Sequence, residues 1–277
     1  MLIADPSVGF MHPQEEQQGT WDISTAPESW SKSFYMGSVA NANAMNSCIL
    51  SDDGLHMYVV HQTGVVGQWN LGTAWDISTC VYFGKKDFSA NDTKTYGIAM
   101  SVDGTKVLIL GNTNDRIYEY TLSTPFNITT ATYVRNYQVN LHGTYLHGFT
   151  TDRSGTYMLT IEYNNDYIWR YGMSSPWDLS VPWSGGALSI NAYDTAPGKA
   201  TFSTKGDFLF LIGVTGNKLV QFSLPTQWDI NSAVYLRQKS LLTACGTSVW
   251  QAHFKSDGKK MYILGGSNKT VYQYELT

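Results

Sequence analysis

A short motif of the form Trp-Asp-Ile-Ser-Thr recurs along this 277-residue chain and constrains its fold more than any other feature. The aromatic residues of its copies are separated by 54, 51, 51 and 51 residues. A fixed period of that size is typical of repeat architectures, in which each period forms one supersecondary unit. The five copies begin with Trp21-Asp22, Trp75-Asp76, Phe126-Asn127, Trp177-Asp178 and Trp228-Asp229.

A turn glycine repeats with nearly the same period, at residues 54, 104, 155, 206 and 258. Each lies between two apolar runs, as expected for a hairpin, because glycine adopts positive φ at little steric cost. A third, alternating run follows, such as residues 117–122, and a more polar fourth run comes after the motif, such as residues 234–238. Four short antiparallel strands per period, with no room for a helix, predict one blade of a β-propeller.

The spacing of the two landmarks predicts five blades. The motif aromatic follows the turn glycine by 21 or 22 residues, yet the same step from Gly258 leads beyond Thr277. The copy at Trp21, in contrast, has no strands before it. We therefore expect an all-β domain over residues 21–277, in which residues 21–38 supply the outer strand of the last blade and close the ring. Such closure also protects edges that would otherwise pair with other chains.

Residues 1–20 fall outside the repeat. They contain Pro6, Pro13 and a glutamine- and glutamate-rich run at 14–18, and they show neither strand nor helix periodicity. This composition predicts an N-terminal arm that becomes ordered only against a partner.

Charge and composition exclude several classes of partner. Only 14% of the residues are charged, the net charge is −4 and no Lys/Arg cluster is present, which argues against nucleic-acid binding. No apolar run reaches the roughly 20 residues of a membrane-spanning helix, and no signal peptide is visible, so we expect a soluble protein made in a cytoplasm. Cys48, Cys80 and Cys245 have no metal-binding spacing and are expected to be buried apolar residues. No cofactor is expected.

The repeated motif itself has two interpretations. Its tryptophans could form sugar-stacking platforms, or they could fill the wedge between neighbouring blades. Phe126, which lacks the indole N–H, favours packing. The following Asp, or Asn127, is predicted to cap a short turn. Five equal metal sites are disfavoured, because no second acidic ligand repeats with the motif.

Positions that fail to repeat are better candidates for function. The residues eight positions before each turn glycine are Asn46, Tyr96, His147, Gly198 and Trp250. The first strand of each propeller blade lines the central channel, so these residues should ring one of its mouths. Asn46, Tyr96, His147 and Trp250 could therefore bind a small polar ligand, although a plug that fills the channel is the favoured alternative.

Catalytic signatures are absent from the sequence. It contains no G-x-S-x-G, H-E-x-x-H, P-loop or dinucleotide-binding motif. Asp92, Asp152 and Asp194 leave open the carboxylate pair of an inverting glycosidase. Carboxylates scattered on a solvated surface are much commoner, so we expect a protein that is not an enzyme.

The strings Ser-Asp-Gly-Lys-Lys-Met-Tyr-Ile-Leu at residues 256–264 and Val-Tyr-Gln-Tyr-Glu-Leu-Thr at 271–277 resemble WD-repeat and related propellers. The tail Thr-x-Trp-Asp-Ile-Ser-Thr, as at residues 73–79, resembles a repeat of tailed-bacteriophage and marine bacterial proteins. The likeness covers residues 21–277, with departures at Phe126-Asn127 and Ser154-Gly155.

That resemblance implies a virion protein, a capsid decoration or a tail or fibre component, which is held to other virion proteins by its N-terminal arm and could contact the host surface. The alternative is an extracellular, lectin-like module for a host-surface glycan. A glycoside hydrolase is a third hypothesis.

Overall fold

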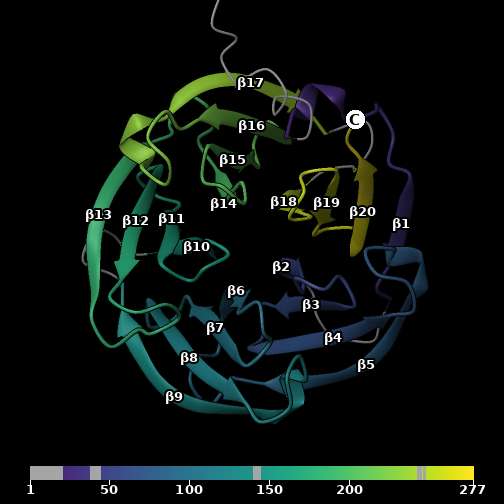
Figure 1. Cartoon of the computed structure of the whole chain (residues 1–277), viewed down its shortest axis with the longest axis vertical. Coiled ribbons are helices and arrows are strands. Elements are labelled where there is room, and N and C mark those ends of the chain that lie inside the picture. The colour runs from purple at the N-terminus through teal and green to yellow at the C-terminus, as the bar shows by residue number, and fades with distance from the viewer. Residues whose placement is uncertain (1–20, 38–44, 140–144, 242–244, 246–247) are drawn as a thin grey trace, which may run out of the picture.

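The computed structural model describes residues 21–37, 45–139, 145–241, 245 and 248–277, and it confirms an all-β, five-bladed propeller (Figure 1). Each blade is a four-stranded antiparallel sheet whose first strand lies nearest the centre of the ring. Blade 1 consists of β2 (Met45–Leu50), β3 (His56–His61), β4 (Val65–Leu71) and β5 (Cys80–Asp87). Blade 2 consists of β6 (Thr95–Met100), β7 (Lys106–Gly111), β8 (Arg116–Leu122) and β9 (Ala131–Gln138).

The remaining blades follow the same plan around the ring. Blade 3 consists of β10 (Leu146–Thr151), β11 (Tyr157–Glu162), β12 (Tyr167–Met173) and β13 (Pro182–Ser189). Blade 4 consists of β14 (Pro197–Phe202), β15 (Phe208–Gly213), β16 (Lys218–Ser223) and β17 (Val234–Ser240). Blade 5 consists of β18 (Val249–Phe254), β19 (Lys260–Gly265), β20 (Thr270–Glu275) and β1 (Lys32–Tyr35).

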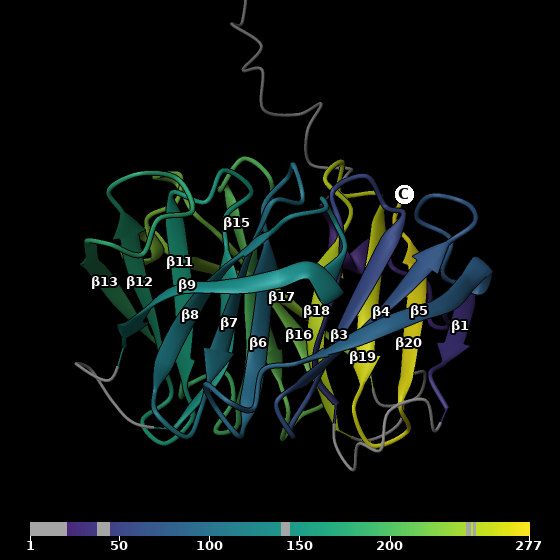
Figure 2. The same cartoon turned by 90° about the horizontal axis from the view of Figure 1, so that it is seen from below.

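The ring closes as predicted. Strand β1 pairs antiparallel with β20, with Lys32 opposite Gln273 and Tyr35 opposite Thr270, so the start and the end of the propeller share one sheet. The outermost position of every blade is therefore occupied, which leaves the same pattern of edges all around the ring (Figure 1). In the side view, β1 lies at the rim of the ring next to β20 (Figure 2). Residue 38 and the predicted arm, residues 1–20, lie outside the described residues.

The core lies between the blades rather than within a single layer. The second strands are almost wholly buried on both faces, whereas fourth strands such as β5 and β17 alternate between half-buried and exposed residues. One apolar cluster joins Tyr262 and Val271 of blade 5 to Met57 and Trp69 of blade 1. Because each blade is covered by a neighbour on both sides, its inner strands read as continuous apolar runs instead of alternating ones.

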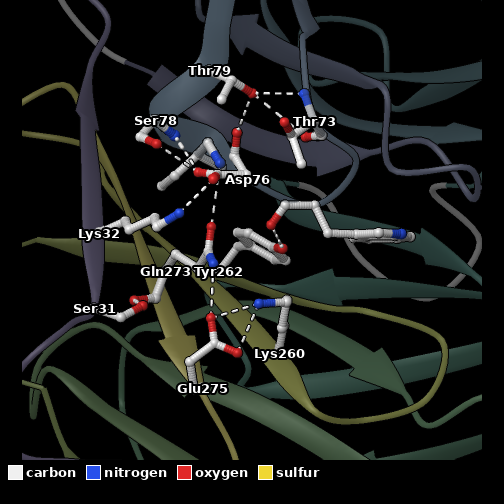
Figure 3. Close-up of polar contacts among 12 residues, drawn as sticks. Ser31, Lys32, Thr73, Asp76, Ser78, Thr79, Lys260, Tyr262, Gln273 and Glu275 are labelled. Carbon is white, nitrogen blue, oxygen red and sulfur yellow. Dashed lines mark hydrogen bonds and ion pairs between the residues drawn. The ribbon is translucent and has the colours of Figure 1, made fainter.

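The repeated motif joins each blade to the one before it, as Figure 3 shows for blades 5 and 1. The Asp76 carboxylate accepts a hydrogen bond from the Ser78 N–H at 3.0 Å, which caps the short 3₁₀ helix η3 (Ile77–Thr79). The Gln273 side chain of β20 accepts the Ile77 N–H at 3.2 Å, and Lys32 of β1 forms an ion pair with Asp76. The motif of blade 1 is therefore held by strands of blade 5.

The same junction recurs around the ring. The third-strand side chain at the position of Gln273, which is buried in four blades and half-buried in blade 3, contacts the next motif in every blade. The Ile128 N–H donates to Gln68, the Leu179 N–H to Glu119 and the Ile23 N–H to Gln221, while Arg170 donates to the Trp228 carbonyl. The motif at Trp21-Asp22 thus occupies the same place in blade 5 as the other motifs occupy in theirs.

The motif aromatics close over the turn glycines. The Trp75 ring lies so near Gly54 that a Cβ there would come within 2.4 Å of the ring, and Gly54 itself has φ +72°. The Trp75 ring also lies 6.3 Å from that of Tyr262 in blade 5, so it fills the wedge between two blades. These contacts agree with the interpretation that the motif aromatics pack between blades instead of stacking on sugars. Trp21 and Trp75 also line a cavity that is described below.

Cys48, Cys80 and Cys245 are free, with Cys48 and Cys245 buried and Cys80 half-buried. Within the part of the chain that is described, no three His, Cys, Asp or Glu side chains gather into a metal site. No helix among these residues has the length and apolar character needed to cross a membrane.

Candidate functional site: the two mouths of the channel

The residues predicted to ring the channel each occupy a β-bulge. The pairing of the first and second strands shifts register at Asn46, Tyr96, His147 and Trp250, and in blade 4 it shifts between Pro197 and Ala200. A bulge leaves its extra residue unpaired and turns its side chain away from the ladder. The five bulges lie at the same end of the first strands, so they define one mouth of the channel, which we call the bulge-side mouth.

Side chains of the bulge-side mouth pack against one another. The His147 ring centroid lies 5.0 Å from that of Tyr96, 5.8 Å from Trp250, 4.8 Å from Tyr145 and 4.3 Å from Tyr163. His147 is 5% exposed and Tyr96 is 6% exposed. Three of the four predicted residues are thus brought together, in contacts that suit a plug.

Asn46, the fourth predicted residue, is held by the backbone of the next blade. Its Nδ2 donates to the Thr95 carbonyl at 3.0 Å, and the side chain is buried. The amide therefore secures the neighbouring bulge through one of its two N–H donors.

Lys199 is a further member of this mouth that the sequence analysis missed, as it missed Tyr145 and Tyr163. The bulge of blade 4 contains two residues, Gly198 and Lys199, so the repeat spacing points to the glycine while the lysine supplies the side chain. Its ammonium donates to the His147 carbonyl and lies 5.7 Å from the centre of the Tyr96 ring. Burial lowers the pKa of Lys199 to about 7. Burial, and then the nearby Lys199, lower the pKa of His147 to about 3.

The opposite end of the channel contains an open cavity of about 130 Å³. It is lined by the last residues of the first strands and by the turns that follow, so we call it the turn-side mouth. Residues from all five blades contribute, which places the cavity on the axis of the ring. At about 30 Å³ per water molecule, its volume has room for about four waters or one small ligand.

The turn-side mouth is framed by the residues two positions before each turn glycine. These five positions do not repeat, and all of them line the cavity. We call them the turn ring: Asp52, Val102, Arg153, Thr204 and Ser256. The bulge positions were selected because they vary where the rest of the blade repeats. The turn ring varies in the same way, so the same criterion identifies it from the sequence.

An ion pair crosses the turn-side mouth. The Arg153 guanidinium donates from Nε and Nη2 to the two carboxylate oxygens of Asp52, both at 2.6 Å. Asp52 belongs to blade 1 and Arg153 to blade 3, which are not neighbours in the ring, so the pair spans the opening. The Asp52 hydrogen bond raises the pKa of Arg153. Burial lowers the pKa of His253, also in the lining, to about 4, so its imidazole is neutral at neutral pH.

The carboxylates considered for glycoside hydrolysis hold loops in place. Asp92 accepts the N–H groups of Lys94, Thr113 and Asn114 at 2.9, 3.2 and 3.0 Å. Asp194 accepts those of Ala196, Thr215 and Gly216 at 2.9, 3.2 and 3.0 Å, in the equivalent place of blade 4. Both side chains are buried, and their acceptor oxygens are occupied by backbone donors. This arrangement suits a structural role.

Asp152 lines the turn-side cavity but is also engaged by its own turn. Its oxygens accept the Ser154 N–H at 3.0 Å and the Tyr157 N–H at 2.6 Å. A second carboxylate of the lining, Asp52, is paired with Arg153. Neither carboxylate is therefore positioned as an unpartnered acid or base.

No protein-family model and no curated protein sequence matches the chain. Solved structures match it at low identity. The Kuenenia stuttgartiensis hydrazine synthase aligns with a TM-score of 0.51 and 13% identity, over 83% of this chain and 58% of that one. A functionally unknown protein from Desulfotomaculum acetoxidans aligns with a TM-score of 0.50 and 12% identity, over 81% and 63%. The propeller domain of Myceliophteria thermophila Cps50 (Swd1) aligns with a TM-score of 0.47 and 10% identity, over 86% and 65%.

These likenesses concern the fold alone. The chain spans less than two thirds of the length of each of these structures. Propellers serve many unrelated functions, so a shared fold does not transfer an activity.

Proposed function

We propose that this chain is a non-enzymatic interaction protein whose propeller binds a small, neutral, polar ligand, such as a sugar of a surface glycan, at the turn-side mouth. The observation that carries the proposal is the axial cavity of about 130 Å³, framed by five residues that vary where the rest of the blade repeats. Ligand sites are concave and combine apolar walls with a few convergent polar groups.

The chemistry of the lining favours a neutral polyhydroxy ligand. The bidentate Asp52–Arg153 pair presents both carboxylate acceptors and guanidinium donors, which suit hydroxyl groups that donate and accept. The two charges offset one another, and Asp152 is held by backbone donors. Trp21 and Trp75 add aromatic surface to the wall. These groups support a lectin-like role.

The family resemblance supports a setting for such a module. We propose that the protein works on the virion of a tailed phage, as a capsid decoration or a tail or fibre component. Residues 1–20 would attach it to other virion proteins, and the turn-side mouth would meet the host surface. Deleting residues 1–20 should then abolish incorporation into particles while the propeller still folds. Normal incorporation of the truncated protein would contradict this setting.

Ligand binding is tested with a glycan array, followed by calorimetry on any hit. Arg153→Met should weaken binding at least tenfold, because it removes the donors that cross the mouth and leaves Asp52 unpaired. Arg116→Met, at the start of β8 in blade 2 and outside the cavity lining, is the matched control and should bind as the wild type does. An array without hits would contradict the sugar proposal. A hit that is insensitive to Arg153→Met but lost on Tyr96→Phe would move the site to the bulge-side mouth.

A further inference from the structure

The bulge-side mouth contains a buried lysine, Lys199, whose ammonium has no acidic partner among the described residues. We propose that Lys199, together with His147, forms a binding site for a small monovalent anion, either a halide ion or the carboxylate of a small acid. This site is separate from the turn-side cavity and does not depend on sugar binding there.

The first observation is the environment of the Lys199 ammonium. Lys199 is 2% exposed, and its one hydrogen-bond partner among the described residues is the His147 carbonyl. A lysine ammonium has three donors, and none of the ion pairs between described residues includes this one. A buried ammonium is stable only when it is paired and hydrogen-bonded. Its environment is therefore incomplete.

The second observation is the imidazole of His147. Both ring nitrogens are buried, and neither has a hydrogen-bond partner among the described residues. The ring is close enough to Lys199 for the ammonium to affect its titration. In the neutral imidazole one nitrogen carries a hydrogen and can donate. Two adjacent buried residues thus present unused donors in the same mouth.

The Lys199 ammonium favours an anion over a cation, and the close packing around it favours a small anion over a large one. Tyr96, Tyr163 and Trp250 surround His147 at centroid distances of 5.0, 4.3 and 5.8 Å, and the centre of the Tyr96 ring lies 5.7 Å from the Lys199 ammonium. The Tyr96 hydroxyl accepts from Gln62 at 2.9 Å, which leaves its own hydrogen able to donate. Any ion bound within a cluster packed this closely must be small, of about halide or formate size.

The experiment measures thermal unfolding at constant ionic strength in sodium bromide or sodium formate, against a sodium salt of a bulky sulfonate. An anion that binds only the folded state raises Tm with its concentration. The wild type and Lys205→Met, which changes an exposed lysine, should show this rise with at least one of the two anions. Lys199→Met should show no rise with either one.

A wild type that responds equally to all three salts, or a Lys199→Met variant that responds as the wild type does, overturns the proposal. If Lys199→Met does not fold, crystals of the wild type soaked in bromide or in formate decide. A bromide anomalous peak, or formate density, within hydrogen-bonding distance of Lys199 Nζ supports the site. The absence of both overturns it.

Discussion

The two mouths of the channel are built from equivalent positions of the same five blades, yet they have opposite character. The bulge-side mouth is filled by His147 and its aromatic neighbours, with Lys199 buried among them. The turn-side mouth is open, and an Arg–Asp pair and hydroxyl side chains frame it. The repeated residues therefore determine where the mouths lie, while the residues that differ between blades determine whether a mouth is packed or open.

The largest expected effect tests whether the bulge-side mouth is a packed plug. Tyr96→Ala should lower the free energy of unfolding by about 3 kcal/mol, because truncating a buried aromatic residue removes apolar contact and leaves a cavity. Thr204→Ala at the turn-side mouth should cost less than about 1 kcal/mol, since that side chain is only partly buried. Urea unfolding measures both. Equal losses in the free energy of unfolding would contradict the inference that one mouth is packed and the other is open.

A slightly smaller loss of stability is expected when a turn glycine next to the turn-side mouth is replaced. Gly155→Ala should lower the free energy of unfolding by about 2–3 kcal/mol, from strain at positive φ and from overpacking. The new Cβ would lie 2.3 Å from the Trp177 ring, at a residue with φ +72°. Gly72→Ala is the control, because its Cβ would meet only ordinary contacts, the nearest at 3.7 Å. If both variants lose the same free energy of unfolding, packing of the motif aromatic is not the reason that a glycine is required at the turn.

The pH dependence of stability probes the buried lysine. The folded-state pKa of Lys199 is lowered to about 7, below the 10.5 of a free lysine, so between these values the unfolded chain binds more protons than the folded one. Stability should therefore rise with pH above 7, by at most about 1.4 kcal/mol per unit, and this contribution is lost as pH falls toward 7.

The comparison is made between wild type and Lys199→Met in zwitterionic buffer without added halide or carboxylate. Among the described residues, Lys199 contacts His147, whose imidazole has a pKa lowered to about 3 by burial, and Tyr96, whose phenol has a pKa raised by burial. Neither titrates between pH 7 and 9. The difference in stability between the two proteins should change over that range, and a constant difference would show that the lysine keeps its ordinary pKa.

The smallest expected effect on stability is at the Asp52–Arg153 pair. Both partners are partly exposed, so Asp52→Asn should change the free energy of unfolding by less than about 1 kcal/mol. The same variant should still weaken sugar binding, because it alters the acceptors that face the cavity. Calorimetry and urea unfolding on one protein sample separate the two effects. A large loss of stability would make this pair a structural clamp instead of a recognition element.

The repeat, the number of blades, the capping role of the motif acid and the closure of the ring could all be predicted from the sequence alone. These features are local or periodic: a turn glycine, a capped motif and an alternating strand have the same physical cause in every blade. The copy at Trp21 was sufficient to predict that β1 completes blade 5, which the pairing of Lys32 with Gln273 confirms.

Whether each mouth is packed or open could be seen only in the tertiary structure. The two-residue bulge that brings Lys199 to His147 is a shift in strand pairing, and spacing along the chain cannot reveal it. The Asp52–Arg153 pair joins residues 101 positions apart in non-adjacent blades. Such contacts depend on how side chains of different blades meet around the axis, and the energies that select them arise only when the ring is closed.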